Sequence, residues 1–295
     1  MALARVLQSP RGLDNRHDPV TLCREGVCYL AAAYNVDVER RVCRRKGYRK
    51  VVDLPGHSPY PYFGGCLFVS NGRLMLLSPD YSYAVLRTGL HDSAMSYATV
   101  FNRVYYSNGY ENGYVENAES HPWEVGEYVG PDTTRVFSDP PTGHILCLWN
   151  GRMFIAEGST LWYSEPFAYH AYDLGRNFVP FSSRIRMVIG VADGMFVSDE
   201  HTTYALVGSS PEDWFVRKVA GYPAVEGTAL HVESSRIGDG SLPPGIYAMW
   251  MSARGICLGG LNGYFRNLTE EHIKCPAGTR GTALIRDGRY ITIVW

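Results

Sequence analysis

The sequence predicts an all-β fold, arranged as a β-propeller-like ring of five or six small antiparallel blades. Short apolar segments rich in β-branched and aromatic residues recur along the chain, and they are too short for helices. Two-residue turns such as Asn150-Gly151 and Asp193-Gly194 separate them, and these pairs suit type I′ hairpins because both central residues need positive φ. Between His144 and Gly208 the pattern occurs twice in succession, which indicates a repeat.

The repeat favours a ring because a meander of three or four strands cannot keep both faces dry alone. Several meanders can do so by packing face to face around an axis, and a closed ring leaves only short edges. The predicted hairpin tips lie roughly thirty to sixty residues apart, a spacing typical of propeller blades. A two-sheet β-sandwich is the alternative architecture.

The chain divides into residues 1–55, an extended N-terminal arm with closing strands, and residues 56–295, the propeller-like domain. Proline and glycine punctuation at Pro10, Gly12 and Pro19 indicates an irregular entry. Residues 54–65 contain three prolines and three glycines and are expected to form a linker or long loop. Besides the two central repeats, the predicted units are 66–87, with a turn at Asn71-Gly72; 97–115, with the weaker turn pair Phe101-Asn102; 246–269; and a closing strand pair at 282–295.

Composition argues against several functions. Among the 295 residues only 19% are charged and the net charge is −1, so no basic stripe for sequence-specific nucleic-acid binding is expected. Seven basic residues between 40 and 50 are the local exception; they indicate a solvated strand pair or a contact with an acidic neighbour, with phosphate contact as the alternative. No apolar run is long enough for a membrane segment, and no leader opens the chain, so synthesis in a cytoplasm is expected.

The cysteines and histidines do not predict a metal site or a cofactor. Seven cysteines are scattered along the chain, and we expect reduced, structural thiols. Cys23, Cys28 and Cys43 lie near His17, but their spacing matches no paired zinc arrangement.

No catalytic residue is predicted either. The motifs of a nucleophile elbow and of a phosphate loop are missing, and His170 near Asp173 lacks a nucleophile. A glycosidase would need two carboxyl groups facing each other across a sugar-sized cleft. The acidic residues of predicted turns are the candidates for that pair: Glu157, Glu165, Asp173, Asp193, Asp199 and Glu200. Their simpler role is to cap turns and keep strand edges soluble.

Aromatic loops predict protein contacts instead. The chain has 21 tyrosines, and those in loops cannot all be buried in one small ring, so some are expected to face partners. The candidate interaction residues are Arg40, Arg41, Arg44, Arg45, Tyr60, Tyr62, Tyr110, Tyr114, Tyr169 and Tyr172.

Sequence motifs at both ends resemble one family. SPRGLDNR from Ser9, followed by YNVDVERRVCRRKGYRKV from Tyr34, resembles the opening shared by tail hub, nozzle and related tail proteins of tailed bacteriophages. LWYSEPFAYHAYDLG from Leu161 is similar to the middle blades of that family, and MWMSARGICLGGLNGYFRNLTE from Met249 is similar to its closing blades. The resemblance covers nearly the whole chain. It implies a β-propeller-like virion protein and supplies no catalytic residues.

Together these observations predict a non-enzymatic structural component of a bacteriophage tail, in the tail tip, baseplate or hub region. Its expected partners are other tail proteins, in a symmetric homo-oligomer of about three or six copies within the virion. A host-receptor or glycan-binding protein of the tail tip is the alternative, and a glycosidase or depolymerase is the least favoured one.

Overall fold

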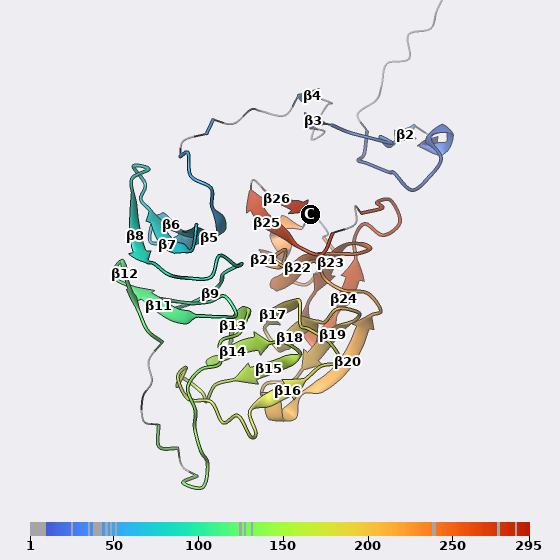
Figure 1. The fold of residues 1–295 in the computed structure, drawn as a ribbon. Coiled ribbons are helices and arrows are strands. Elements are labelled where there is room, and N and C mark those ends of the chain that lie inside the picture. The colour runs from blue at the N-terminus through green and yellow to red at the C-terminus, as the bar shows by residue number, and fades with distance from the viewer. Residues whose placement is uncertain are drawn as a thin grey trace, which may run out of the picture.

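The computed structural model describes residues 10–295 except for 25, 35, 38–42, 45–46, 48, 51, 124–125, 127, 131, 238–239, 276–277 and 287. Five antiparallel sheets of four strands each follow one another in chain order along an arc (Figure 1). We call them the first to fifth blades. The described residues form no α-helix, only four short 3-10 helices. The predicted all-β, β-propeller-like fold of five or six small blades is therefore confirmed.

Each blade is a simple meander, with strands in the order of the sequence. The strands of the first two blades are β5 (His57–Tyr62), β6 (Gly65–Ser70), β7 (Arg73–Leu77), β8 (Tyr83–Arg87), β9 (Ser96–Val100), β10 (Arg103–Ser107), β11 (Asn112–Glu116) and β12 (Glu119–His121). The third and fourth blades hold β13 (Ile145–Trp149), β14 (Arg152–Glu157), β15 (Thr160–Tyr163), β16 (Phe178–Pro180), β17 (Met187–Val191), β18 (Gly194–Ser198), β19 (Thr203–Val207) and β20 (Phe215–Ala220).

The fifth blade and a smaller sixth sheet complete the order. The fifth blade holds β21 (Leu230–Glu233), β22 (Ile246–Ser252), β23 (Gly255–Gly259) and β24 (Phe265–Asn267). The sixth sheet has only two strands, β25 (Gly281–Arg286) and β26 (Arg289–Val294). The meander prediction missed the fourth strand of several blades, since it ended the central units at their third strand.

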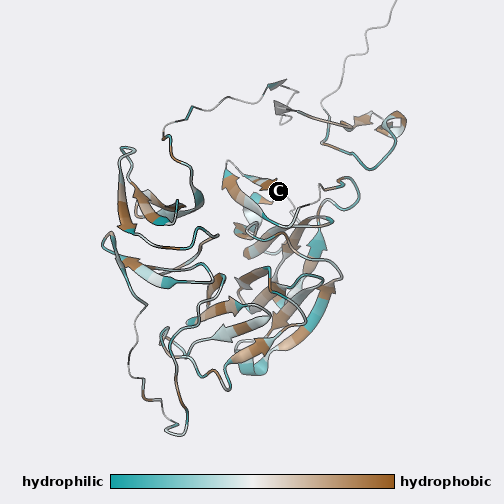
Figure 2. Ribbon diagram, in the orientation of Figure 1, coloured by the Kyte–Doolittle hydropathy of each residue, from teal (hydrophilic) through white to brown (hydrophobic). Residues whose placement is uncertain are grey.

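The core consists of apolar clusters between consecutive sheets. Leu67 of the first blade and Tyr106 of the second belong to one cluster, and Phe154 of the third and Leu206 of the fourth belong to another. The pairs second–third, fourth–fifth and fifth–sixth share three more clusters. Figure 2 shows the hydrophobic residues concentrated on the strands. Each sheet therefore keeps its faces dry by stacking on its neighbours, as the repeat predicted.

The predicted turns form at three of four positions. Asn71-Gly72 and Asn150-Gly151 have positive φ at both residues, as a type I′ turn requires. Phe101-Asn102 also closes a hairpin, and Phe101 adopts a φ of 52°. The placement of a turn at Asp193-Gly194 is wrong by one residue, because Val191 pairs with Gly194.

Residues 54–65, predicted as a linker, contain β5, so that prediction is wrong for most of the segment. β5 pairs with β6 alone and is an edge strand. Proline cannot donate to a ladder, but on an edge its missing N–H can face away from the partner strand. Pro59 and Pro61 are therefore compatible with the strand, and the ladder shifts register between His57 and Tyr60.

The second strands of two blades end in the same turn. Asn108 follows β10, and its side chain accepts hydrogen bonds from the backbone N–H of Tyr110 and Glu111. Asp199 follows β18 and accepts in the same way from His201 and Thr202. These Asx turns orient the chain for the third strand; the first also uses Gly109, which has a φ of 90°, and the second contains no glycine.

The N-terminal arm differs from its prediction as closing strands. Its described strands are β1 (Cys23–Arg24), β2 (Val27–Cys28), β3 (Val36–Asp37) and β4 (Cys43–Arg44). β1 pairs with β2 and β3 with β4, so none of them extends β25–β26. Cys23 and Cys28 form a disulfide, which corrects the expectation of reduced thiols for this pair. No helix in the described part of the chain is long and apolar enough to cross a membrane.

Candidate functional site

The arginine cluster of the arm is only partly described. Arg44 lies on β4 opposite Val36, and it is exposed. Arg40, Arg41 and Arg45 lie outside the described residues. The four arginines therefore remain candidate interaction residues, and Arg44 is the one whose exposed position is known.

Three of the six candidate tyrosines are buried. Tyr62 packs between the first and second blades, and its hydroxyl accepts a hydrogen bond from Ala118 N at 2.8 Å. Tyr114 lies beneath the Arg103 guanidinium, and the Tyr172 hydroxyl donates to Met153 O at 3.1 Å. Their prediction as partner contacts is wrong: Tyr62 and Tyr114 lie on strands and fill space between blades, and Tyr172 is buried in the loop between β15 and β16.

The other three tyrosines retain some exposure. Tyr60 and Tyr169 are half-buried, and Tyr60 stacks on Tyr97 at 4.9 Å and hydrogen-bonds Thr99. Tyr110 is 61% exposed and stacks on His91 at 4.1 Å. Tyr110 is thus the tyrosine of this set best placed to contact another molecule.

The acidic candidates are occupied by structural contacts. Arg135 donates to Glu165 at 2.6 Å and to Asp173 at 2.8 Å, and these bonds raise the pKa of its guanidinium despite the opposing cost of burial. Asn177 bonds both Glu165 and Arg135. One guanidinium thus holds both carboxylates in structural contacts.

The remaining acidic side chains are engaged separately. Glu157 accepts from the Trp162 indole, Glu200 pairs with Arg186, and Asp193 accepts from Asn262 N. Burial also raises the pKa of the Cys147 thiol to about 11 and of the Cys257 thiol to about 12, so neither is a ready nucleophile.

The strongest candidate surface is the outer face of the β25–β26 hairpin. Every second residue of the two strands points away from the fifth blade, and this face carries Leu284, Ile291 and Ile293, followed by Trp295. Leu284 is 50% exposed and Ile293 63% exposed. Ile285 and Tyr290 on the opposite face pack against the fifth blade. An apolar face of this kind marks an interaction surface.

The free edge of the same hairpin strengthens this assignment. In the five complete blades a third and a fourth strand follow the second. β26 is the second strand of its sheet, and within the described chain no strand pairs with its outer side. Sequence analysis identified this strand pair but missed the surface, although the signal was present: TALIR and RYITIVW place apolar residues on both faces.

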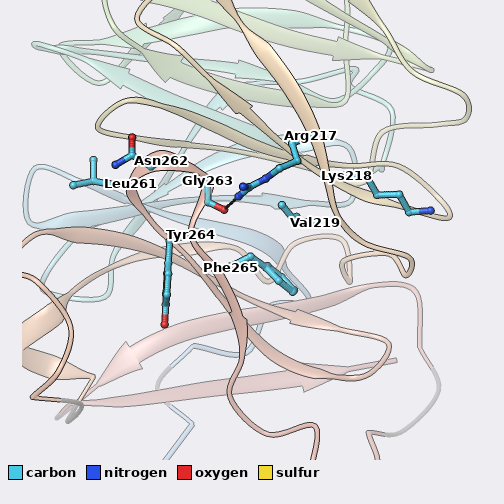
Figure 3. A pocket seen from close by; sticks show the side chains of 8 residues that line it. All are labelled: Arg217, Lys218, Val219, Leu261, Asn262, Gly263, Tyr264 and Phe265. Atoms are coloured by element: carbon cyan, nitrogen blue, oxygen red, sulfur yellow. Dashed lines mark hydrogen bonds between the residues drawn. The ribbon is translucent and has the colours of Figure 1, made fainter.

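A second candidate is a groove between the fourth and fifth blades (Figure 3). Its volume is about 640 Å³, and it lies between β20 and the turn before β24. Arg217 donates to Gly263 O across it, and Lys218 is exposed beside it. The lining residues are Arg217, Lys218, Val219, Leu261, Asn262, Gly263, Tyr264 and Phe265. This set offers cationic and aromatic contacts but no carboxylate, so the groove can bind a ligand and lacks the acid pair of a glycosidase.

Comparison with known proteins adds the fold alone. No protein-family profile and no curated protein matches the sequence. Among solved structures, the chain is similar to the extracellular domain of a protein described as a hybrid two component system from B. thetaiotaomicron, with 9% identity over 83% of this chain and a TM-score of 0.53. It spans only 31% of that structure, and the same share of a second structure of such a domain.

This chain spans a larger share of two further similar structures. A gluconolactonase from Xanthomonas campestris matches with 11% identity over 82% of this chain and 83% of its own, with a TM-score of 0.48. The WD40 β-propeller domain of Doa1 matches with 13% identity over 73% of this chain and 69% of its own, with a TM-score of 0.45. At these identities function does not transfer with the fold.

Proposed function

We propose that this protein is a non-enzymatic structural component of a bacteriophage tail, which acts by assembling with neighbouring tail proteins. The observation that carries the proposal is the apolar outer face of the sixth sheet, on which Leu284, Ile291 and Ile293 are exposed. An isolated soluble protein rarely leaves such a surface uncovered, because it invites pairing with other chains.

The partner best suited to this surface is a β-hairpin of a neighbouring tail protein. Main-chain hydrogen bonds to β26 would give affinity, and contacts to Leu284, Ile291 and Ile293 would fix the register of the added strands.

The assignment to a tail is supported by sequence motifs. The NVD and arginine-rich segment of the arm and the blade segments resemble tail hub and nozzle proteins, as described above. In a tail, several copies would surround the tail axis with rotational symmetry, about three or six in number. Exposed Arg44 and Tyr110 would provide further contacts at the edges of such interfaces.

Incorporation into virions tests the proposal. Phage carrying Ile293→Lys should assemble tails that contain at least about tenfold less of this protein by quantitative mass spectrometry, because an ammonium group would be buried in the interface. Val136→Lys is the matched control, since Val136 is also exposed but lies in the segment before the third blade. Absence of the wild-type protein from purified virions, or equal incorporation of both variants, would refute the proposal.

A host-surface or glycan-binding role is the second candidate, and the groove of Figure 3 favours it. Tyr264 and Lys218 provide a ring and a charge to a sugar or acidic ligand. Purified protein should then bind host cells, and Tyr264→Ala should reduce binding at least about fivefold without affecting incorporation into tails. If cell binding is absent, this second role is excluded and the structural role is unaffected.

A further inference from the structure

A cluster of metal-binding side chains joins the N-terminal arm to the fifth blade. Asp14 and His17 lie on the arm, and His272 lies in the loop after β24, 258 residues from Asp14 in the chain. One carboxylate oxygen and one nitrogen from each histidine lie within 4.8 Å of one another. We propose that this cluster binds a divalent transition-metal ion such as Zn²⁺ and thereby fixes the arm to the propeller.

The ligand types fit such an ion. Two imidazoles and one carboxylate are a common protein ligand set for zinc, with a water in the fourth position. The Nδ1 atoms of His17 and His272 each lie 2.9 Å from Oδ2 of Asp14. Zinc bonds of about 2.0–2.1 Å in a tetrahedral site place neighbouring ligand atoms about 3.3 Å apart, which is close to the 2.9 Å between each nitrogen and Oδ2 of Asp14.

The charge of the cluster also fits. The Asp14 carboxylate accepts hydrogen bonds from the rings of His17 and His272 and from the backbone N–H of Arg16. A metal ion would replace the two Nδ1 protons that the hydrogen-bonded arrangement requires.

Exposure leaves an entry path. The side chain of Asp14 is only 4% exposed, whereas those of His17 and His272 are 58% and 40% exposed. The ion would thus be anchored by a buried carboxylate and would reach it from the solvent side, where a water can complete the coordination.

Neighbouring groups hold the ligands in place. The second oxygen of Asp14 accepts from the backbone N–H of Arg16 and His17, and the ring of Tyr29 stacks on His272 at 4.9 Å. Asn15 exchanges side-chain hydrogen bonds with the backbone of Lys274 in both directions. Such outer contacts orient the ligands before the ion arrives, and preorganisation of this kind strengthens metal binding.

Zinc titration of the full-length protein tests the proposal. Isothermal titration calorimetry with ZnCl₂ at pH 7.5 should give one ion per chain, and His17→Gln and His272→Gln should each weaken binding at least about 100-fold. Neither side chain is buried, and glutamine keeps a polar side chain at each position, so folding should be unaffected. His91→Gln is the matched control, because His91 also pairs with a carboxylate, Glu111, and should leave zinc binding unchanged.

Two more measurements separate this site from other binding. Cys275→Ser should retain the ion, which distinguishes the cluster from the nearby thiol. Zinc should slow proteolytic release of the arm in the wild type but not in His272→Gln. The proposal is overturned if the wild type binds no stoichiometric zinc, or if both histidine variants bind as the wild type does; the hydrogen-bonded cluster would then be a clasp without metal.

Discussion

Replacing Arg135 with alanine should destabilise the third blade strongly. The side chains of Arg135, Glu165 and Asp173 are 18%, 10% and 8% exposed. The free energy lost on breaking these ion pairs should therefore be close to that of buried pairs and not to the small value of surface pairs. Arg135→Ala leaves two carboxylates close together without their cation. Removal of one partner from a buried pair costs about 3–5 kcal/mol, and we adopt about 3 kcal/mol because the site is not completely closed.

Hydrogen exchange measured by mass spectrometry detects this loss of stability in the peptides around the site. A cost of about 3 kcal/mol corresponds to roughly 100-fold faster exchange in peptides covering residues 165–177. Arg176→Ala is the matched control, since Arg176 pairs with Asp132 at 3.5 Å on an exposed surface and should change exchange less than about threefold.

A difference in exchange of less than about threefold between Arg135→Ala and the wild type at pH 7 would refute this reasoning.

Two further changes test the core and the Asx turns. Gly259→Ala places a Cβ 2.5 Å from the fully buried Phe196 ring and should cost about 1–3 kcal/mol, seen as faster exchange in β18 and β23; Gly240→Ala, with open space around it, should have little effect. Asp199→Asn should cost about 1–2 kcal/mol at pH 7 and less at pH 3. Burial opposes ionisation of Asp199, but bonds from His201, Ser182 and Thr202 lower its pKa, and stability from a lowered pKa is lost as the pH falls. Equal losses at both pH values, measured by exchange in residues 198–203, would contradict that account.

Much of the fold was predictable because the information is local. An apolar run followed by Asn-Gly specifies a hairpin by itself, as at Asn71 and Asn150. β5 was missed because prolines on an edge strand resemble those of a loop, and β20 because Arg217 and Lys218 interrupt its apolar pattern. These strands form because neighbouring strands provide a ladder, which no local pattern reports.

The candidate sites were less predictable for the same reason. Tyr62 and Tyr114 lie on strands, but which strand face a neighbouring blade covers depends on packing, and Tyr172 lies in a loop that no alternation describes. His17 was considered with the nearby cysteines, whereas its partner His272 is remote in sequence. The exposed face of β25–β26 could have been recognised, since a half-exposed strand should carry polar residues on one side.

The apolar clusters join each blade only to the sheets before and after it, and in the described chain none links the first blade to β25–β26. Cooperativity should then pass between nearest neighbours, as in linear repeat arrays, and local melting can begin at a terminal sheet while the middle stays intact. Protection from exchange should be highest in β14 and β18 and decline towards both extremities. A molecule of this kind can open reversibly at its terminal sheets while its central blades stay folded.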